Sequence, residues 1–199
     1  MNYLAHAFLS FGHPEITVGN LISDFVKGKK KYDYPLLIQR GIALHRLIDR
    51  FTDDHPVTQQ AKEFFRSEYR LYSAVFIDIV YDHFLANDRN LFNEYSLFDF
   101  SQTIYSNLDK FRTWFPAGFA VIFPYMKSYN WLYNYISHAG IKKSFRGIVY
   151  RATYLSESDT AFMLFEKHYN ELKSCYMEFF PLLNAFAKEQ FEDLMKSPS

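Results

Sequence analysis

The sequence predicts an all-α fold, a helical bundle in a single domain. Apolar residues recur at intervals of three and four, and no segment of any length shows the alternation that is typical of a half-buried strand. Only 7 glycines and 7 prolines interrupt the 199 residues. A chain of this length can bury a sizeable core. With 22 phenylalanines and 16 tyrosines, we expect that core to consist largely of aromatic rings.

Start and stop signals divide the chain into eight expected helices. Gly28 suits the left-handed end of the second helix, and Pro35 and Pro56 suit the first turns of the third and fourth. The fourth is expected to cross the whole domain, and the last to be long and rich in aromatic residues. The expected ranges are 3–11, 16–26, 35–51, 56–85, 99–111, 117–135, 138–153 and 157–188.

Composition excludes several classes of protein. Cys175 is the only cysteine, so no internal disulfide can form and a reducing compartment, the cytoplasm, is expected. The first residues lack the basic start of a secretion signal, and no apolar run reaches the length of a membrane helix. Lysine plus arginine balance aspartate plus glutamate at 22 each, which argues against a nucleic-acid partner.

The third expected helix carries ionisable residues on the face that should be buried. His45 and Asp49 lie one helical turn apart on that face, so they present a nitrogen and an oxygen to one point. A core histidine hydrogen-bonded to its neighbouring carboxylate is the alternative interpretation. The inward stripe follows the spacing i, i+3, i+4, i+7 through Ile38, Gly41, Ile42, His45, Ile48 and Asp49.

The fourth expected helix repeats this pattern. Asp82 and His83 lie on either side of the centre of its apolar face, with Asp78 at the edge. Buried charges are tolerated when they are paired or bind a metal. A second inward pair of histidine and aspartate on a neighbouring helix therefore suggests a shared cation.

Two earlier segments add one candidate ligand each. His6 lies in a segment that is apolar nearly all round, and Asp24 interrupts an apolar run. By contrast, His13 and His55 each precede a proline and are interpreted as surface or capping residues, and His168 as a satisfied core histidine. Mixed imidazole and carboxylate ligands suit Mn, Fe, Zn or Mg, and the carboxylates favour Mn or Mg. The candidate ligands are His6, Asp24, His45, Asp49, Asp78, Asp82 and His83.

Such a cluster predicts metal-assisted hydrolysis, because a divalent ion lowers the pKa of bound water. Phosphate esters fit, since Arg46 and Arg50 flank the His45/Asp49 pair and could bind phosphate oxygens, although they could equally be surface ion-pair partners. No serine elbow, Walker loop or HExxH helix is present in the sequence. A basic cluster of lysines is either a solvated loop or a contact for an anion or an acidic partner. It comprises Lys27, Lys29, Lys30 and Lys31.

These segments resemble the acyl carrier protein phosphodiesterases. The resemblance is specific over about the first 85 residues, and a weaker similarity continues at 168–169 and 179–181. The matching motifs are residues 1–6 (MNYLAH), 19–21 (GNL), 24–28 (DFVKG), 41–42 (GI), 44–46 (LHR), 48–49 (ID), 51–53 (FTD), 55–56 (HP) and 82–85 (DHFL).

The resemblance implies an HD-domain-like helical fold and an enzyme that removes 4′-phosphopantetheine from the serine of holo acyl carrier protein. It also implies a divalent cation, with Mn²⁺ preferred. The sequence has no His-Asp dipeptide, so the ligand order of HD enzymes does not transfer, and Asp78 stays an alternative to Asp82. The residues that take the implied catalytic roles are Asp24, His45, Arg46 and Asp49, and those that take the metal-binding roles are His6, Asp24, His45, Asp49, Asp82 and His83.

The implied substrate also gives the basic residues a role. Acyl carrier proteins are small and acidic, so a positive surface should steer their encounter with the enzyme. The lysine cluster Lys27–Lys31 and Arg66 are the expected contacts. Two alternatives stay open from the residues themselves. One is a metal-dependent phosphohydrolase acting on another small phosphoester or nucleotide, and the other is a helical binding module whose inward His and Asp pairs are structural.

Overall fold

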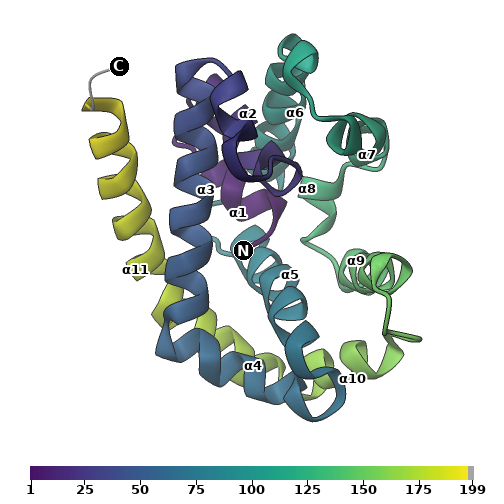
Figure 1. The fold of residues 1–199 in the computed structure, drawn as a ribbon. Helices are drawn as coiled ribbons and strands as arrows, with labels where there is room; N and C mark the ends of the chain where they lie inside the picture. The colour runs from purple at the N-terminus through teal and green to yellow at the C-terminus, as the bar shows by residue number, and fades with distance from the viewer. Residues whose placement is uncertain (197–199) are drawn as a thin grey trace.

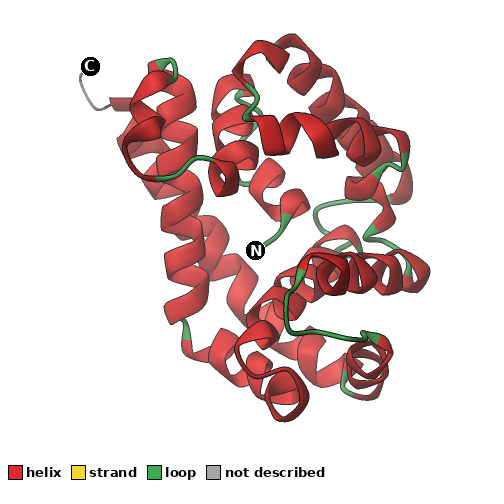
Figure 2. Ribbon diagram, turned by 45° about the vertical axis from the view of Figure 1, so that its right-hand side comes forward, coloured by secondary structure: helices red, strands yellow, loops and turns green. Residues whose placement is uncertain are grey.

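The computed structural model describes residues 1–196, and every regular element within that range is a helix (Figures 1 and 2). The all-α prediction is therefore confirmed. The α-helices are α1 Tyr3–Phe8, α2 Pro14–Ile22, α3 Leu36–Asp54, α4 Pro56–Tyr69, α5 Ser73–Ala86, α6 Glu94–Lys110, α7 Ala117–Ser128, α8 Trp131–Asn134, α9 His138–Arg151, α10 Asp159–Lys167 and α11 Tyr169–Lys196; short 3₁₀ helices are η1 Ser23–Phe25, η2 Gly28–Asp33, η3 Arg70–Tyr72 and η4 Arg112–Trp114.

Local capping explains several of the helix starts. His55 caps α4, since its Nδ1 accepts a hydrogen bond from the Val57 N–H at 3.3 Å, which agrees with the capping role expected for this residue. Asn93 and Ser96 form a reciprocal capping box at the start of α6. This box starts α6 several residues before the 99–111 range that apolar spacing alone predicts.

The expected long helix over 56–85 is wrong, because the chain breaks between α4 and α5. Arg70 adopts a left-handed φ of 45°, and its N–H ends α4 on the Arg66 carbonyl. The preceding Tyr69 is buried, and its hydroxyl donates to Glu157 at 2.9 Å and accepts from the Ala161 N–H at 2.8 Å. A tertiary contact to residues far along the chain therefore holds the break, and no glycine or proline signals it.

Two other expected helices also divide. The 117–135 range breaks at Asn130, whose φ is 44°, and the 157–188 range breaks at His168, which ends α10 just before α11 begins. The 16–26 range ends as an α-helix at Ile22 and continues as the 3₁₀ helix η1. Helical periodicity continues across each break, so sequence spacing alone does not locate them.

Two glycines let α2 approach α3 closely enough to place the site. A Cβ on Gly19 would lie 2.1 Å from the Ile38 carbonyl oxygen, and one on Gly41 would lie 2.3 Å from the Ile16 carbonyl oxygen. The two helices consequently pack backbone to backbone, side by side in Figure 1. This contact brings η1, which follows α2 and carries Asp24, against the middle of α3.

The remaining helices enclose this pair. In Figure 1, α11 lies along the outer side of α3 and α4, and α6 to α9 form the opposite side of the molecule. The expected aromatic core is present among the described residues, with Phe65, Phe76 and Phe145 as fully buried examples. Within residues 1–196, none of the helices combines the length and the hydropathy that a membrane span requires.

Candidate metal centre

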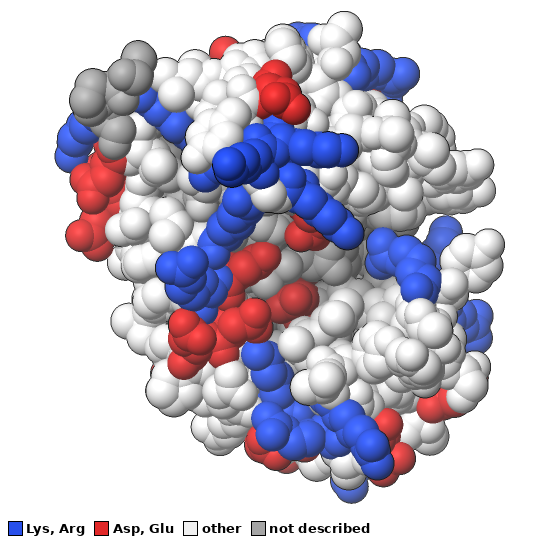
Figure 3. Space-filling view, in the orientation of Figure 1, with Lys and Arg blue, Asp and Glu red and all other residues white. Residues whose placement is uncertain are grey.

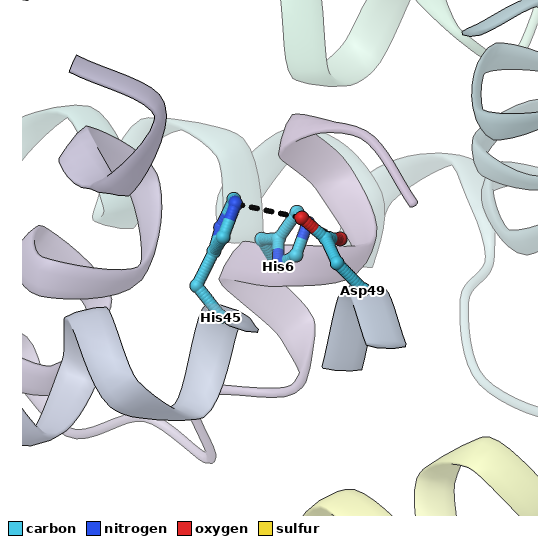
Figure 4. Close-up of side chains that lie close together, drawn as sticks. All are labelled: His6, His45 and Asp49. Carbon is cyan, nitrogen blue, oxygen red and sulfur yellow. Dashed lines mark ion pairs between the residues drawn. The ribbon is translucent and has the colours of Figure 1, made fainter. Parts of the chain in front are cut away.

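Acidic side chains gather in the hollowed centre of the face in Figure 3, with lysines and arginines around them. The structure brings four predicted site residues together here. His6 comes from α1, Asp24 from η1, and His45 and Asp49 from α3. Asp49 is the central member, because its Oδ1 lies 3.2 Å from His6 Nε2 and its Oδ2 lies 2.9 Å from His45 Nε2 (Figure 4).

Asp24 joins the group from the solvent side. Its Oδ1 lies 3.1 Å from His45 Nε2, and its side chain is 70% exposed whereas that of His45 is 7% exposed. His6 and His45 stack with their ring centroids 4.0 Å apart. The group is thus buried on the His6 side and open to solvent at Asp24.

The donor set fits a divalent metal ion. One ligand atom each from His6, His45 and Asp49 lies within 4.8 Å of the others, which is a distance that a single cation can span. Both ring nitrogens of His6 and Nδ1 of His45 are buried and have no hydrogen-bond partner of good geometry among the described residues. Buried imidazole nitrogens normally have a partner, so a cation would satisfy Nε2 of His6, the nitrogen that faces Asp49.

When no cation is bound, the charges within the group favour a proton on His45 that is shared with Asp24 and Asp49 through hydrogen bonds. Burial lowers the pKa of His45, but hydrogen bonds to Asp24 and Asp49 outweigh it and raise that pKa to about 9. Burial and the neighbouring His45 lower the pKa of His6 to about 4. The two histidines hold the pKa of Asp49 well below its usual range, against the effect of burial. A cation would therefore displace a proton from His45, as metal ligands commonly require.

Asp78 and the amino group of Met1 border the group. Met1 N lies 2.8 Å from Asp78 Oδ1 and 3.7 Å from Asp49 Oδ1. Burial raises the pKa of the Asp78 carboxyl, and the ammonium opposes that shift. Asp78 is thus occupied by an ion pair at the edge of the group.

Asp82 is fully buried but uses its oxygens elsewhere. It accepts the backbone N–H groups of Asn2, Leu4 and Ala5 at 3.2, 2.7 and 3.3 Å. Burial raises its pKa to about 7, opposed by the nearby Met1 ammonium and by these hydrogen bonds. The structure does not bring Asp82 into the group of ligand atoms. Asp82 instead fixes the start of α1, the helix that carries His6.

His83 lies apart from the group, and both of its nitrogens have partners. Nδ1 is 2.7 Å from the Tyr135 carbonyl oxygen and Nε2 is 3.1 Å from the Tyr169 hydroxyl. The ring of His138, which sequence reasoning did not single out, lies 5.5 Å away. His138 starts α9 and is half exposed, so no apolar pattern marks it. The contacts of His83 connect α5 to Tyr135, which directly follows α8, and to α11.

Stability below neutral pH should depend on His83. Burial lowers its pKa to about 4 from 6.5 in the unfolded chain, so the unfolded state binds more protons between these values and stability falls as the pH falls from 6.5 to 4. The loss attributable to His83 should approach about 3 kcal/mol across this window. Urea unfolding at several pH values measures it, and a His83→Gln variant with the same pH slope as the parent would contradict this role.

The arginines and lysines that the sequence singled out lie in different parts of the fold. Arg46 Nη2 donates to the Val26 carbonyl oxygen at 2.9 Å, which ties α3 to the chain just after Asp24. Arg66 lies on α4 and pairs with Glu63 at 2.9 Å. The lysines Lys27, Lys29 and Lys30 are exposed and Lys31 is half-buried, around η2, immediately after the segment that carries Asp24.

The fold and this group define a class: an all-helical protein whose N-terminal half holds two buried histidines and a partly buried aspartate that could hold a metal ion. Comparison with known families narrows the class. The family model of acyl carrier protein phosphodiesterase matches residues 1–183. The chain therefore belongs to the acyl carrier protein phosphodiesterase family.

Individual relatives agree with this assignment. The chain is 33% identical over 184 residues to an acyl carrier protein phosphodiesterase of Yersinia pestis, covering 92% of this chain and 95% of that protein. It is 32% identical over 184 residues to one of Photorhabdus laumondii subsp. laumondii, covering 92% and 93%. A protein of the same description from Enterobacter sp. (strain 638) is 31% identical over 191 residues, covering 96% and 99%. No solved structure matches the chain.

Proposed function

We propose that this protein hydrolyses the phosphodiester that joins 4′-phosphopantetheine to the serine of holo acyl carrier protein, giving the apo protein. The observation that carries the proposal is the His6–His45–Asp49 group, which lies within the 1–183 range that the family model matches. A cluster of buried histidines and a carboxylate beside an exposed carboxylate suits metal-assisted hydrolysis of a phosphate ester.

His6, His45 and Asp49 would hold the cation, and Asp24 would complete the ligand set from the exposed side. Mn²⁺ is the proposed ion, because two imidazoles and two carboxylates form a mixed nitrogen and oxygen set. A divalent ion bound there supplies a water of lowered pKa and neutralises phosphate charge. Asp24 stays ionised, since the hydrogen bond from His45 lowers its pKa. The stacked, buried rings of His6 and His45 exclude bulk water from the inner side.

Arg46 is proposed to act as a positioning residue. Its bond to the Val26 carbonyl holds the end of η1 against α3, so the Asp24 carboxylate keeps its place beside His45. Asp82 has a similar role for His6, through the three N–H groups of the chain start. His83 is not included in the proposed ligand set, since its Nδ1 bonds to the Tyr135 carbonyl oxygen and its Nε2 to the Tyr169 hydroxyl.

Metal binding should be measurable without turnover. A ligand that binds only the folded state stabilises it by about 3 kcal/mol at a concentration of 100 times its Kd, which corresponds to a rise in Tm of roughly 5–10 °C for a domain of this size. Thermal unfolding of the parent with Mn²⁺ and with EDTA should differ by this amount. In Asp49→Asn the difference should disappear.

Asp53→Asn is the matched control, because Asp53 lies one turn further along α3 and pairs with Lys62 at 2.8 Å instead of with the histidines. It should keep the full Mn²⁺ effect. An Mn²⁺ effect that survives unchanged in Asp49→Asn would count against the proposed ligand set.

The lysines that follow Asp24 in the chain should steer an acidic carrier protein. Reversing Lys29, Lys30 and Lys31 to glutamate is expected to lower kcat/KM at low salt by about tenfold or more and to weaken its salt dependence, because steering acts mainly on the association rate. Reversing the exposed Lys167, Lys173 and Lys188 of α10 and α11 changes net charge equally and is the matched control. Equal kinetics of the two triple variants at low salt would remove the steering role.

A further inference from the structure

A pocket of about 300 Å³ opens beside the metal centre, between the chain start and α8 and α9. We call it the α9 pocket. Its size falls at the lower end of the range typical of small-molecule sites. The residues that line it include Tyr3, Ile79, Ile122, Trp131, Gly147 and Arg151.

Small residues on one face of α9 leave the space that forms the pocket. Gly140, Ser144, Gly147 and Arg151 all line it, and they recur at helical spacing along one side of the helix. A Cβ added to Gly147 would meet no atom within 4 Å. Small side chains thus leave space along α9, and the long side chain of Arg151 stands at the end of this stripe.

The chain start separates the pocket from the metal centre. Asn2 and Tyr3 line the pocket, whereas His6 lies one turn further along α1 in the centre. The Tyr3 hydroxyl is within electrostatic reach of both Arg151 and Asp24. Trp131 packs against Tyr3 with the ring centroids 6.2 Å apart. Met1, whose amino group lies 3.7 Å from Asp49 Oδ1, directly precedes Asn2, so the pocket and the candidate metal centre both adjoin the chain start.

The side chains that line the pocket indicate the chemistry of its ligand. Ile79, Ile122 and Trp131 offer apolar surface, and Asn2 and Asn134 offer amide groups. Arg151 and Lys143 are the cations that line the pocket, and Lys143 lies over the Tyr129 ring at 4.1 Å. Within the part of the chain that the structure describes, its lining includes no aspartate or glutamate. A flexible chain of alkyl and amide groups that ends in a phosphate matches this combination, because guanidinium binds phosphate well.

We infer that the α9 pocket receives the pantetheine arm of the substrate and that Arg151, at the Tyr3 end, binds the phosphate that joins the arm to the carrier protein. The inference rests on the proposed function and adds to it the site that holds the phosphopantetheine arm. The scissile phosphate would then lie between Arg151 and the exposed carboxylate of Asp24, with the arm directed away from the carrier protein.

Gly147→Phe tests the pocket, because the ring would fill the space along α9 without straining a left-handed backbone. Holo acyl carrier protein and bis(4-nitrophenyl) phosphate are compared as substrates with Mn²⁺ present. The ratio of kcat/KM for the carrier protein to that for the small diester should fall at least tenfold. Arg146→Phe, on the exposed side of the same helix, is the matched control and should keep the parent ratio. An unchanged ratio in Gly147→Phe would overturn the inference.

Calorimetry with free 4′-phosphopantetheine keeps the test independent of turnover. The parent should bind it saturably, and Gly147→Phe should weaken binding at least tenfold. Arg151→Gln should weaken binding of phosphopantetheine at least tenfold but leave that of pantetheine, which lacks the phosphate, within about twofold. If the parent hydrolyses neither substrate, the proposed function fails. These titrations still test whether the α9 pocket binds phosphopantetheine. Absence of binding by the parent would overturn the assignment.

Discussion

Replacing Asp24 with alanine is expected to lower kcat/KM for holo acyl carrier protein by about 10²–10³-fold, the range typical of losing one preorganised charged group at a reacting centre. The free energy of unfolding should change by no more than about 1 kcal/mol, because an ion pair with an exposed side chain contributes little and the Asp24 side chain, which pairs with His45, is 70% exposed. Steady-state kinetics and urea unfolding of the same preparation measure the two quantities.

The separation of these two effects is what makes Asp24 informative. Removal of His45 or Asp49 would also disturb buried ion pairs, so a loss of activity there could follow from local unfolding. Asp33→Ala supplies the control, since Asp33 is an exposed carboxylate of η2 close to Asp24 in the chain. It should retain the parent kcat/KM. An Asp24→Ala protein that hydrolyses the carrier protein at the parent rate would refute the proposed role.

The second large effect concerns Asp82 and stability. Asp82→Asn is expected to lower the free energy of unfolding by about 3 kcal/mol, because it leaves buried N–H donors without an acceptor and adds a further buried donor. An asparagine keeps one carbonyl oxygen and places an N–H₂ group against the N–H groups of Asn2, Leu4 and Ala5, which the carboxylate now accepts. The measurement is urea unfolding at pH 8, above the Asp82 pKa of about 7.

EDTA in that measurement distinguishes a structural carboxylate from a metal ligand. A residue that only binds metal would show no stability loss in metal-free protein, whereas the hydrogen bonds to the chain start predict the full loss. Asp99→Asn, an exposed carboxylate of α6, should stay within about 0.5 kcal/mol of the parent. A loss seen only when Mn²⁺ is present would make Asp82 a ligand and contradict the structural role.

Local sequence patterns were sufficient to predict much of the fold. Apolar spacing predicted helices throughout, and proline and histidine at 55–56 marked the start of α4. The breaks at Arg70 and Asn130 were missed, because both residues adopt a left-handed φ that sequence assigns most readily to glycine. At Arg70 the neighbouring Tyr69 hydroxyl reaches Glu157 and Ala161, and periodicity within one segment carries no information about such distant partners.

The site shows the same division between local and distant information. His45 and Asp49 share a helix face, so their contact could be predicted from a spacing of four. The inward positions of Asp82 and His83 were also predictable, and both are buried. Their partners were not, because Asp82 bonds to the chain start and His83 to Tyr135 and Tyr169. An apolar face shows that a polar residue is buried, but only the packing of other helices shows what it binds.

The central claim is hydrolysis of the serine phosphodiester of holo acyl carrier protein, and intact-mass spectrometry in ¹⁸O-labelled water tests it most directly. With Mn²⁺, the carrier protein should lose the mass of its phosphopantetheine arm, and the released phosphopantetheine should carry one ¹⁸O on phosphorus while the apo protein carries none. This pattern follows from water attacking phosphorus and the serine oxygen leaving with a proton. A carrier protein of unchanged mass after incubation with metal-loaded enzyme, or ¹⁸O on the carrier protein, would contradict the account.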